Sequence, residues 1–158
     1  MKKVNEILHN NKYQEYIKEL EELEKDRIYC RHNMRHFMDV ARIAYILVLE
    51  NGLNYSKEVI YAIGLLHDIG RIEEYKNNIC HDEASAVMAG EILKETSYTE
   101  DEVSLILKAI RNHGNKDNQD KFLKIIYRSD KLSRNCFECT AISGCKWSDE
   151  KKNLDIKY

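Results

Sequence analysis

A histidine and an aspartate, His67 and Asp68, directly follow an apolar run over residues 59–66. The run has the composition of a buried helix, and an imidazole and a carboxylate at its end cost free energy unless something binds them. A divalent metal ion is the obvious candidate, because it accepts imidazole nitrogen and carboxylate oxygen together. The pair alone is weak evidence, since His81-Asp82 repeats it at the expected polar start of a helix, where Asp82 favours the helix dipole.

Other histidines and a distal aspartate are candidates for the remaining ligands. His36 shares a helical stripe with Val40, and Asp130 shares one with Phe122 and Ile126. A single histidine on an apolar face is more often a satisfied core residue, and a single buried aspartate has an ion pair as its simpler explanation. A metal site is therefore predicted from the candidate ligands taken together and not from any one of them. In chain order they are His36, His67, Asp68, His81, His113 and Asp130.

The apolar spacing predicts an all-α protein, a compact bundle of about six helices with a short C-terminal tail. We expect these helices within residues 1–26, 28–50, 57–68, 82–96, 99–113 and 121–134. Gly70 suits a left-handed C-cap, and residues 71–80 read as a polar loop. Residues 1–158 then form one domain, with an N-terminal amphipathic helix (1–26), a core that carries the candidate ligands (28–134) and a cysteine-bearing tail (135–158).

Composition and charge narrow the classes of function. The chain has 158 residues, no proline and 43% hydrophobic residues, which suits one helical domain with a real core. Its net charge of -2 argues against an extended nucleic-acid surface. No apolar stretch is long enough to cross a bilayer and no signal-peptide pattern is present, so we expect a cytoplasmic protein with no membrane partner. An oligomer is compatible with this composition.

Over roughly residues 28–134, the sequence resembles the HD-domain metal-dependent phosphohydrolases. The resemblance lies in His36-x3-Val40-Ala41, Leu65-Leu-His-Asp-Ile-Gly70, His81-x2-Ala84-Ser85-Ala86, Ile110-x2-His113 and Ser129-Asp130-Lys131-Leu132. It implies the all-helical HD bundle. It also implies that a principal metal ion is held by His36, His67, Asp68 and Asp130. By the same resemblance, His81 and His113 hold a second ion or face the substrate phosphate.

The implied activity is hydrolysis of a phosphate ester or anhydride, with a nucleotide or another small phosphorylated molecule as substrate. One or two divalent ions (Mn, Fe, Co, Mg, Ni or Zn) would activate water and polarise the phosphoryl group. Asp68 is the expected bridging ligand and orients the water. Arg71 stands where many relatives have Lys, and we assign it to substrate phosphate, because arginine is a poor acid or base. Lys131 and Arg35 are further phosphate contacts or solvated charges.

Two other classes of function compete with this interpretation. The first is a regulatory HD domain that binds metal or nucleotide without turnover, and the second is a structural metal-binding protein organised around cysteines. The candidate cysteine ligands are Cys30, Cys136, Cys139 and Cys145. Cys30 lies six residues before His36, and Cys136 lies six residues after Asp130. If those two ligands meet on antiparallel helices, both cysteines are displaced the same way by about 9 Å.

Such a cysteine site would hold zinc or an iron–sulfur cluster and would tie the tail to the second helix. The alternative is a set of reduced, partly buried thiols. His32, one turn before His36, has three interpretations: a neutral structural histidine, a residue at the pocket mouth, or a member of the cysteine site.

Overall fold

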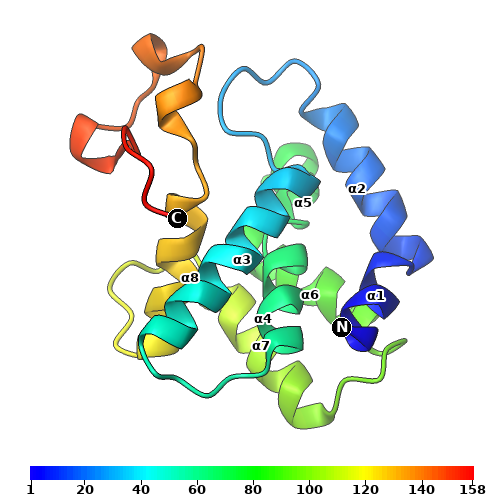
Figure 1. The fold of residues 1–158 in the computed structure, drawn as a ribbon. Coiled ribbons are helices and arrows are strands. Elements are labelled where there is room, and N and C mark those ends of the chain that lie inside the picture. The colour runs from blue at the N-terminus through cyan, green and yellow to red at the C-terminus, as the bar shows by residue number, and fades with distance from the viewer.

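The computed structural model describes residues 1–158 and contains only helices, turns and connecting loops (Figure 1). The α-helices are α1 (Lys2–Leu8), α2 (Asn11–Leu23), α3 (Met34–Glu50), α4 (Lys57–Leu66), α5 (Arg71–Asn77), α6 (His81–Leu93), α7 (Glu100–Asn112) and α8 (Lys121–Leu132). Three short 3₁₀ turns follow in the tail, namely η1 (Cys136–Glu138), η2 (Ile142–Gly144) and η3 (Asp149–Lys151). The all-α prediction is confirmed, with eight α-helices where about six were expected.

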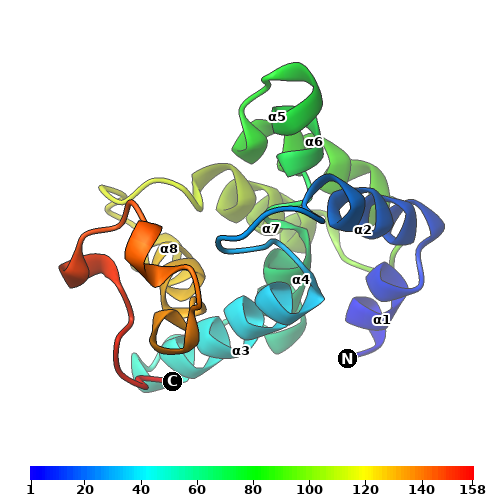
Figure 2. The ribbon, with the colours of Figure 1, turned by 90° about the horizontal axis from the view of Figure 1, so that it is seen from above.

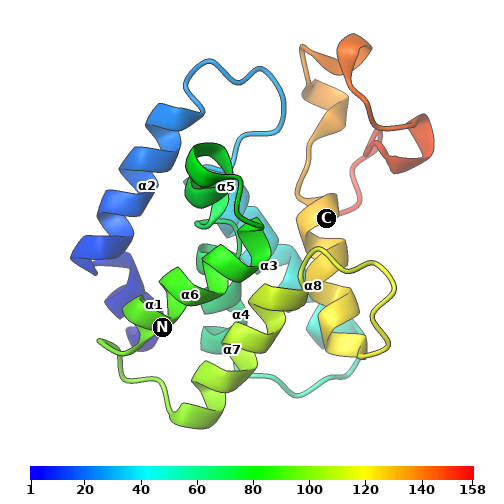
Figure 3. The ribbon, with the colours of Figure 1, turned by 180° about the vertical axis from the view of Figure 1, so that it is seen from behind.

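Helix α4 lies at the centre of the bundle, packed against α1, α3 and α7 (Figures 1 and 3). Seven of its ten residues are buried, and one hydrophobic core of 31 buried residues draws on every helix from α1 to α8. Gly64 allows α3 to approach closely, because an added Cβ would lie only 2.6 Å from the Cβ of Ala41. The C-terminal end of α4, which His67 and Asp68 follow, is therefore deep inside the protein.

The N-terminal segment, predicted as one amphipathic helix over residues 1–26, consists of two helices. The helix is interrupted at His9 and Asn10, where the Asn10 side chain accepts a hydrogen bond from the Tyr13 backbone N–H at 3.1 Å. This is an N-cap contact, which stabilises a new helix start against continuation of the previous helix. The break lets α1 pack on α4 while α2 lies along α5 (Figure 3).

The segment after α4 also differs from the prediction, because residues 71–80 include helix α5 rather than forming a loop. Gly70 has a right-handed φ of -70°, and the left-handed C-cap is instead Asn78, with φ of 56° at the end of α5. Gly70 is needed for space, since an added Cβ would lie 2.2 Å from the Ser85 backbone nitrogen and 2.5 Å from the His81 carbonyl oxygen. This contact brings the start of α6 against the end of α4.

Helices α3 and α8 run antiparallel and lie side by side (Figures 1 and 2). His36 near the start of α3 contacts Ser133 just after α8, while Asn51 after α3 accepts a hydrogen bond from Lys121 at the start of α8. Helix α3 begins at Met34 rather than at residue 28, because the Asn33 side chain caps it. A capping box formed by Thr99 and Glu102 marks the start of α7.

The tail beyond α8 has no α-helix and folds back beside the start of α3 and the end of α8 (Figure 2). Asn153 attaches it to α8, because its side chain donates hydrogen bonds to the carbonyl oxygens of Lys131 at 2.7 Å and Arg134 at 3.0 Å. No helix of the structure has the length and apolar character that a bilayer crossing requires.

Candidate metal centre

Four of the predicted ligands lie together in the interior. His36 comes from α3, His67 and Asp68 follow α4, and Asp130 comes from α8. One potential ligand atom from each lies within 4.8 Å of the others, and all four residues are buried. The His36 Nε2 atom is 3.4 Å from Asp130 Oδ1, and the His67 Nε2 atom is 3.3 Å from Asp68 Oδ2. Packing of α3, α4 and α8 therefore brings together residues separated by up to about ninety positions in the chain.

The hydrogen bonds of the two histidines orient their free nitrogens toward this cluster. His67 Nδ1 lies 2.9 Å from the Gly64 carbonyl oxygen and donates to it, which leaves the Nε2 lone pair buried and without a hydrogen-bond partner. Ser133 Oγ donates to the Asp130 carbonyl oxygen, so it accepts from His36 Nδ1 at 3.0 Å. Both histidines thus present Nε2, in the arrangement that metal-ligating histidines use.

A second group of potential ligands shares Asp68. It contains Asp68, His81 and His113, again with ligand atoms within 4.8 Å of one another. Asp68 Oδ2 faces His36 and His67 at 3.6 and 3.3 Å, whereas Oδ1 faces His81 and His113 at 3.6 and 3.5 Å. The two carboxylate oxygens thus serve different groups, so this aspartate has the geometry of a ligand that bridges two ions.

The electrostatics of the cluster suit metal binding. Burial raises the pKa of Asp68, but its electrostatic interactions with His67, His113 and His36 outweigh burial and hold it well below its ordinary value. Burial and the charge of Asp68 also raise the pKa of Asp130, yet cations led by Arg134 bring it below its ordinary value. Burial lowers the pKa of His36 to about 3. Ionised carboxylates and a neutral imidazole are the protonation states that a metal ion requires.

Asp82 lies beside the second group, although the sequence pointed only to a helix-dipole role. Its Oδ1 atom lies 2.8 Å from His81 Nε2 and 3.4 Å from His113 Nε2. This oxygen is buried and makes no hydrogen bond. Gly114 provides the space, because a Cβ there would lie 2.8 Å from Asp82 Oδ2. The repeated His-Asp pair was the available signal, but only the packing of α6 on α7 shows that Asp82 points inward.

Replacing Asp82 by Asn should therefore weaken binding of a second ion by about ten- to a hundredfold, because the amide lacks the negative charge. The group of His36, His67, Asp68 and Asp130 should keep its ion. Calorimetric titration of chelator-treated protein with Mn²⁺ measures both steps. The matched control is Glu83→Gln, which changes the next, exposed carboxylate. Two unchanged binding steps would contradict a ligand role for Asp82.

His32 lies beside the histidine–aspartate cluster, and the sequence had left its position open. The residue is buried, and its Nε2 atom is 3.6 Å from Asp68 Oδ2. Its other ring nitrogen pairs with the Glu24 carboxylate, which also accepts the His32 backbone N–H at 2.6 Å. Burial raises the pKa of Glu24, but His32 and Tyr75 hydrogen bonds outweigh it and lower this pKa to about 2. An ionised carboxylate therefore orients His32 toward Asp68, as second-sphere carboxylates orient metal ligands.

Two of the cations assigned to substrate phosphate pair with the acids of the cluster. Arg71 Nε donates to Asp68 Oδ1 at 3.0 Å, and its Nη1 atom donates to Glu74 at 2.6 Å. Lys131 Nζ lies 2.6 Å from Asp130 Oδ2. Both cations are thus next to the candidate ligands, where they neutralise charge and can reach an anion bound there.

The third cation, Arg35, lies outside the ligand cluster. Its side chain is 70% exposed and pairs with Glu138 of the tail at 3.0 Å. Sequence reasoning did not identify Arg134, whose side chain is only 10% exposed and whose Nη2 atom lies 3.2 Å from His36 Nε2 and 3.5 Å from Asp130 Oδ1. Arg134 is therefore the cation closest to the free nitrogen of His36.

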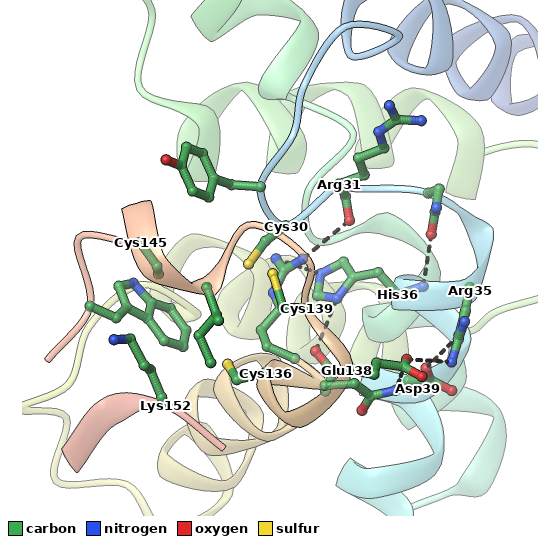
Figure 4. A pocket seen from close by; sticks show the side chains of 17 residues that line it. Cys30, Arg31, Arg35, His36, Asp39, Cys136, Glu138, Cys139, Cys145 and Lys152 are labelled. Atoms are coloured by element: carbon green, nitrogen blue, oxygen red, sulfur yellow. Dashed lines mark hydrogen bonds and ion pairs between the residues drawn. The ribbon is translucent and has the colours of Figure 1, made fainter. Parts of the chain in front are cut away.

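All five cysteines are free thiols, and four of them line one cavity beside the histidine–aspartate cluster (Figure 4). The four are the predicted set, Cys30, Cys136, Cys139 and Cys145. His36 also lines this cavity, so it borders the candidate metal centre. Cys80 is exposed and lies outside it.

Comparison with known proteins agrees with this geometry. The family model described as HD domain matches residues 33–135, a segment that contains every ligand of the two groups. An uncharacterized protein of Clostridium beijerinckii (strain ATCC 51743 / NCIMB 8052) is 43% identical over 158 residues, which covers 100% of both chains. No solved structure matches the chain. The matched segment spans well over half of the protein, and the chain therefore belongs to the HD-domain family.

Proposed function

We propose that the protein is a metal-dependent phosphohydrolase that acts on a small phosphorylated substrate, either a nucleotide or another phosphate ester or anhydride. The observation that carries this proposal is the Nε2 lone pair of His67. It is fully buried, has no hydrogen-bond partner and points at the carboxylates of Asp68 and Asp130. A buried acceptor facing two other acceptors is unfavourable without a cation between them.

The donor set favours a catalytic ion over a structural one. Imidazole nitrogens and carboxylate oxygens suit Mn²⁺, Fe²⁺, Co²⁺ or Zn²⁺, and the mixed set lacks the thiolates typical of structural zinc. Such an ion, when bound, lowers the pKa of water and polarises a phosphoryl group. We infer one ion at His36, His67, Asp68 and Asp130, and a second at Asp68, His81 and His113. Asp68 serves both groups and is placed to orient a water molecule between them.

Three cations around the cluster supply the charge that a phosphate needs. Arg71 and Lys131 already pair with the acids of the centre, and Arg134 donates to the His36 nitrogen that an ion would use. An ion held at that nitrogen would replace this contact, and the buried Arg134 guanidinium would then be free beside the site. Arginine binds phosphate oxygens through two parallel N–H groups. We therefore assign Arg134, with Arg71 and Lys131, to substrate phosphate.

Changing Arg134 to Gln should raise KM by about ten- to a hundredfold, because a charge-assisted contact contributes about 1.5–3 kcal/mol. The effect on kcat should be smaller, since the metal ligands remain. Steady-state kinetics measure both constants. Arg128→Gln is the matched control, because Arg128 is an exposed arginine of α8, the helix that precedes Arg134. A lowered kcat with unchanged KM would contradict a role for Arg134 in substrate binding.

The activity itself is tested with chelator-treated protein reloaded with Mn²⁺, Co²⁺ or Fe²⁺. We expect it to hydrolyse at least one member of a panel of aryl phosphate monoesters, diesters, nucleoside monophosphates and dinucleoside polyphosphates, and to lose this activity on renewed chelation. Tight metal binding without turnover of any substrate would contradict the hydrolase proposal. That result would favour a regulatory HD domain that binds metal or nucleotide.

A further inference from the structure

We propose that the protein holds another metal centre, separate from the histidine–aspartate cluster, in which four thiolates bind zinc or an iron–sulfur cluster. The ligands are Cys30, Cys136, Cys139 and Cys145. All four line one cavity of about 240 Å³ (Figure 4). They come from two separate parts of the chain, the loop before α3 and the tail after α8. Four convergent thiols are the donor set of structural zinc and of iron–sulfur clusters.

The antiparallel packing of α3 and α8 explains the convergence. The start of α3 and the end of α8 lie at the same end of the pair, as the contact between His36 and Ser133 shows. Cys30, before α3, and Cys136, after α8, therefore lie at the same end of this helix pair. Neither residue continues its helix, because α3 begins at Met34 and α8 ends at Leu132. The helical displacement expected from the sequence thus predicted correctly that Cys30 and Cys136 lie near the same end of the bundle. Their actual positions depend on the loop before α3 and on the tail after α8.

Two hydrogen bonds hold the loop and the tail together on either side of Cys30. Tyr29 donates its hydroxyl to the Gly144 carbonyl oxygen at 2.8 Å, next to Cys145. Arg134 donates to the Arg31 carbonyl oxygen at 3.1 Å. Each bond joins a neighbour of Cys30 to a residue within two positions of a tail cysteine. The backbone is thus arranged so that thiols of both segments face the same space.

The tail needs such a centre because it buries little apolar surface. Its regular structure consists of three 3₁₀ turns of three residues each. Large apolar side chains in it are exposed, namely Phe137, Leu154 and Ile156. Ordering about twenty residues costs conformational entropy that this burial does not offset. Small segments of this kind are commonly held by a structural metal, whose binding free energy stabilises the folded form.

The charge around the cavity complements a thiolate centre. Four thiolates with a zinc ion carry a net charge of about -2, and a tetracysteinyl iron–sulfur cluster is likewise anionic. Arg31, Arg134 and Lys152 line the cavity, and the Lys152 side chain is only 12% exposed. Cations in these positions complement the negative charge of a thiolate centre.

The thiols are near one another but not at final ligand spacing. No three cysteine sulfurs lie within 4.8 Å of one another, unlike the histidine and aspartate ligand atoms. The metal therefore completes the site by drawing the tail inward, or a polynuclear cluster spans the wider spacing. In either case the centre and the folded tail form together.

Thiol alkylation of the wild-type protein, purified without oxygen, tests the proposal directly. Cys80 is exposed and serves as an internal control that should react at once. The four cavity cysteines should react at least about tenfold more slowly than after chelation, because bound thiolates are poor nucleophiles. Peptide mass spectrometry gives the rate at each position. Rates that are the same with and without chelator would overturn the proposal.

Elemental analysis identifies the occupant and separates this centre from the histidine–aspartate cluster. Wild-type protein should contain either iron with acid-labile sulfide or zinc that Asp68→Asn retains, and each of these results supports the centre and names its metal. The double variant Cys136→Ser/Cys139→Ser should lose that metal and keep Mn²⁺ binding at the other site. Asp68→Asn should do the reverse, so a failed hydrolase proposal would not affect this test.

If the double variant does not fold, the chelator dependence of alkylation in Asp68→Asn decides the question. Protection of the four thiols in that variant supports the centre, since the histidine–aspartate site has lost its shared ligand. Absence of thiol-bound metal in both the wild-type protein and Asp68→Asn would overturn the proposal.

Discussion

Replacing Asp68 by Asn is expected to abolish phosphohydrolase activity and to weaken divalent-metal binding at least about a hundredfold. Asp68 is buried, and its two oxygens face different histidine groups, so one substitution removes a ligand from both. The amide also removes the negative charge that the surrounding histidines and Arg71 stabilise. No other residue of the cluster belongs to both groups, which is why we expect the largest functional effect here.

Metal content by elemental analysis, Mn²⁺ titration and turnover of the substrate panel measure this effect. Circular dichroism checks that helicity is kept, since Asn has nearly the shape of Asp. Asp117→Asn provides the matched control, because it makes the same chemical change at an exposed loop position. Activity within a few-fold of wild type in Asp68→Asn would remove Asp68 from the centre and with it the two-ion interpretation.

Gly70→Ala is expected to produce the largest loss of stability, about 1–3 kcal/mol. The added methyl group would meet the Ser85 nitrogen at 2.2 Å and the His81 carbonyl oxygen at 2.5 Å. Both atoms belong to the backbone of α6, so no side-chain rotation relieves the clash. The start of α6 must move away from α4, and His81 moves with it. Binding of the second ion should therefore weaken more than binding at the group of His36 and Asp130.

Thermal unfolding and Mn²⁺ titration of the same variant measure the two consequences. Gly90→Ala is the control, because Gly90 lies within α6 and an added Cβ meets only the Leu107 side chain at 3.8 Å. That substitution should be neutral or stabilise the protein by up to about 1 kcal/mol, since alanine favours helix more than glycine. Equal unfolding temperatures for the two variants would contradict the close α4–α6 contact.

Much of the helical architecture was predictable from the sequence, and its errors have physical causes. Apolar periodicity located most helices, including α7 within residues 99–113. The break at Asn10 and the short helix α5 were missed. Asparagine side chains compete for backbone hydrogen bonds, and a helix of seven residues shows little periodicity. A left-handed C-cap was predicted at Gly70, but the reason for a glycine there is the close approach of α6 and not a positive φ.

The candidate site was predicted unevenly for a related reason. His36 and Asp130 carried a signal because each shares a stripe with core residues of its helix. Arg134 carried none and Asp82 only the repeated His-Asp pair, since a charged residue near a helix end is ordinarily solvated. Their positions depend on which helix packs against that end. Arg35 shows the converse, because it adjoins a ligand in sequence yet pairs with Glu138 at the surface.

The sequence by itself determined the helical class and the ordered set of histidines and aspartates, because these follow from local periodicity and from residue chemistry. Only the tertiary structure decided which oxygen of Asp68 faces which histidines, that Asp82, His32 and Arg134 point into the centre, and that four cysteines share a cavity. These features depend on the crossing of α3, α4, α6 and α8. Contacts between distant segments are set by packing, which residue spacing along one helix does not encode.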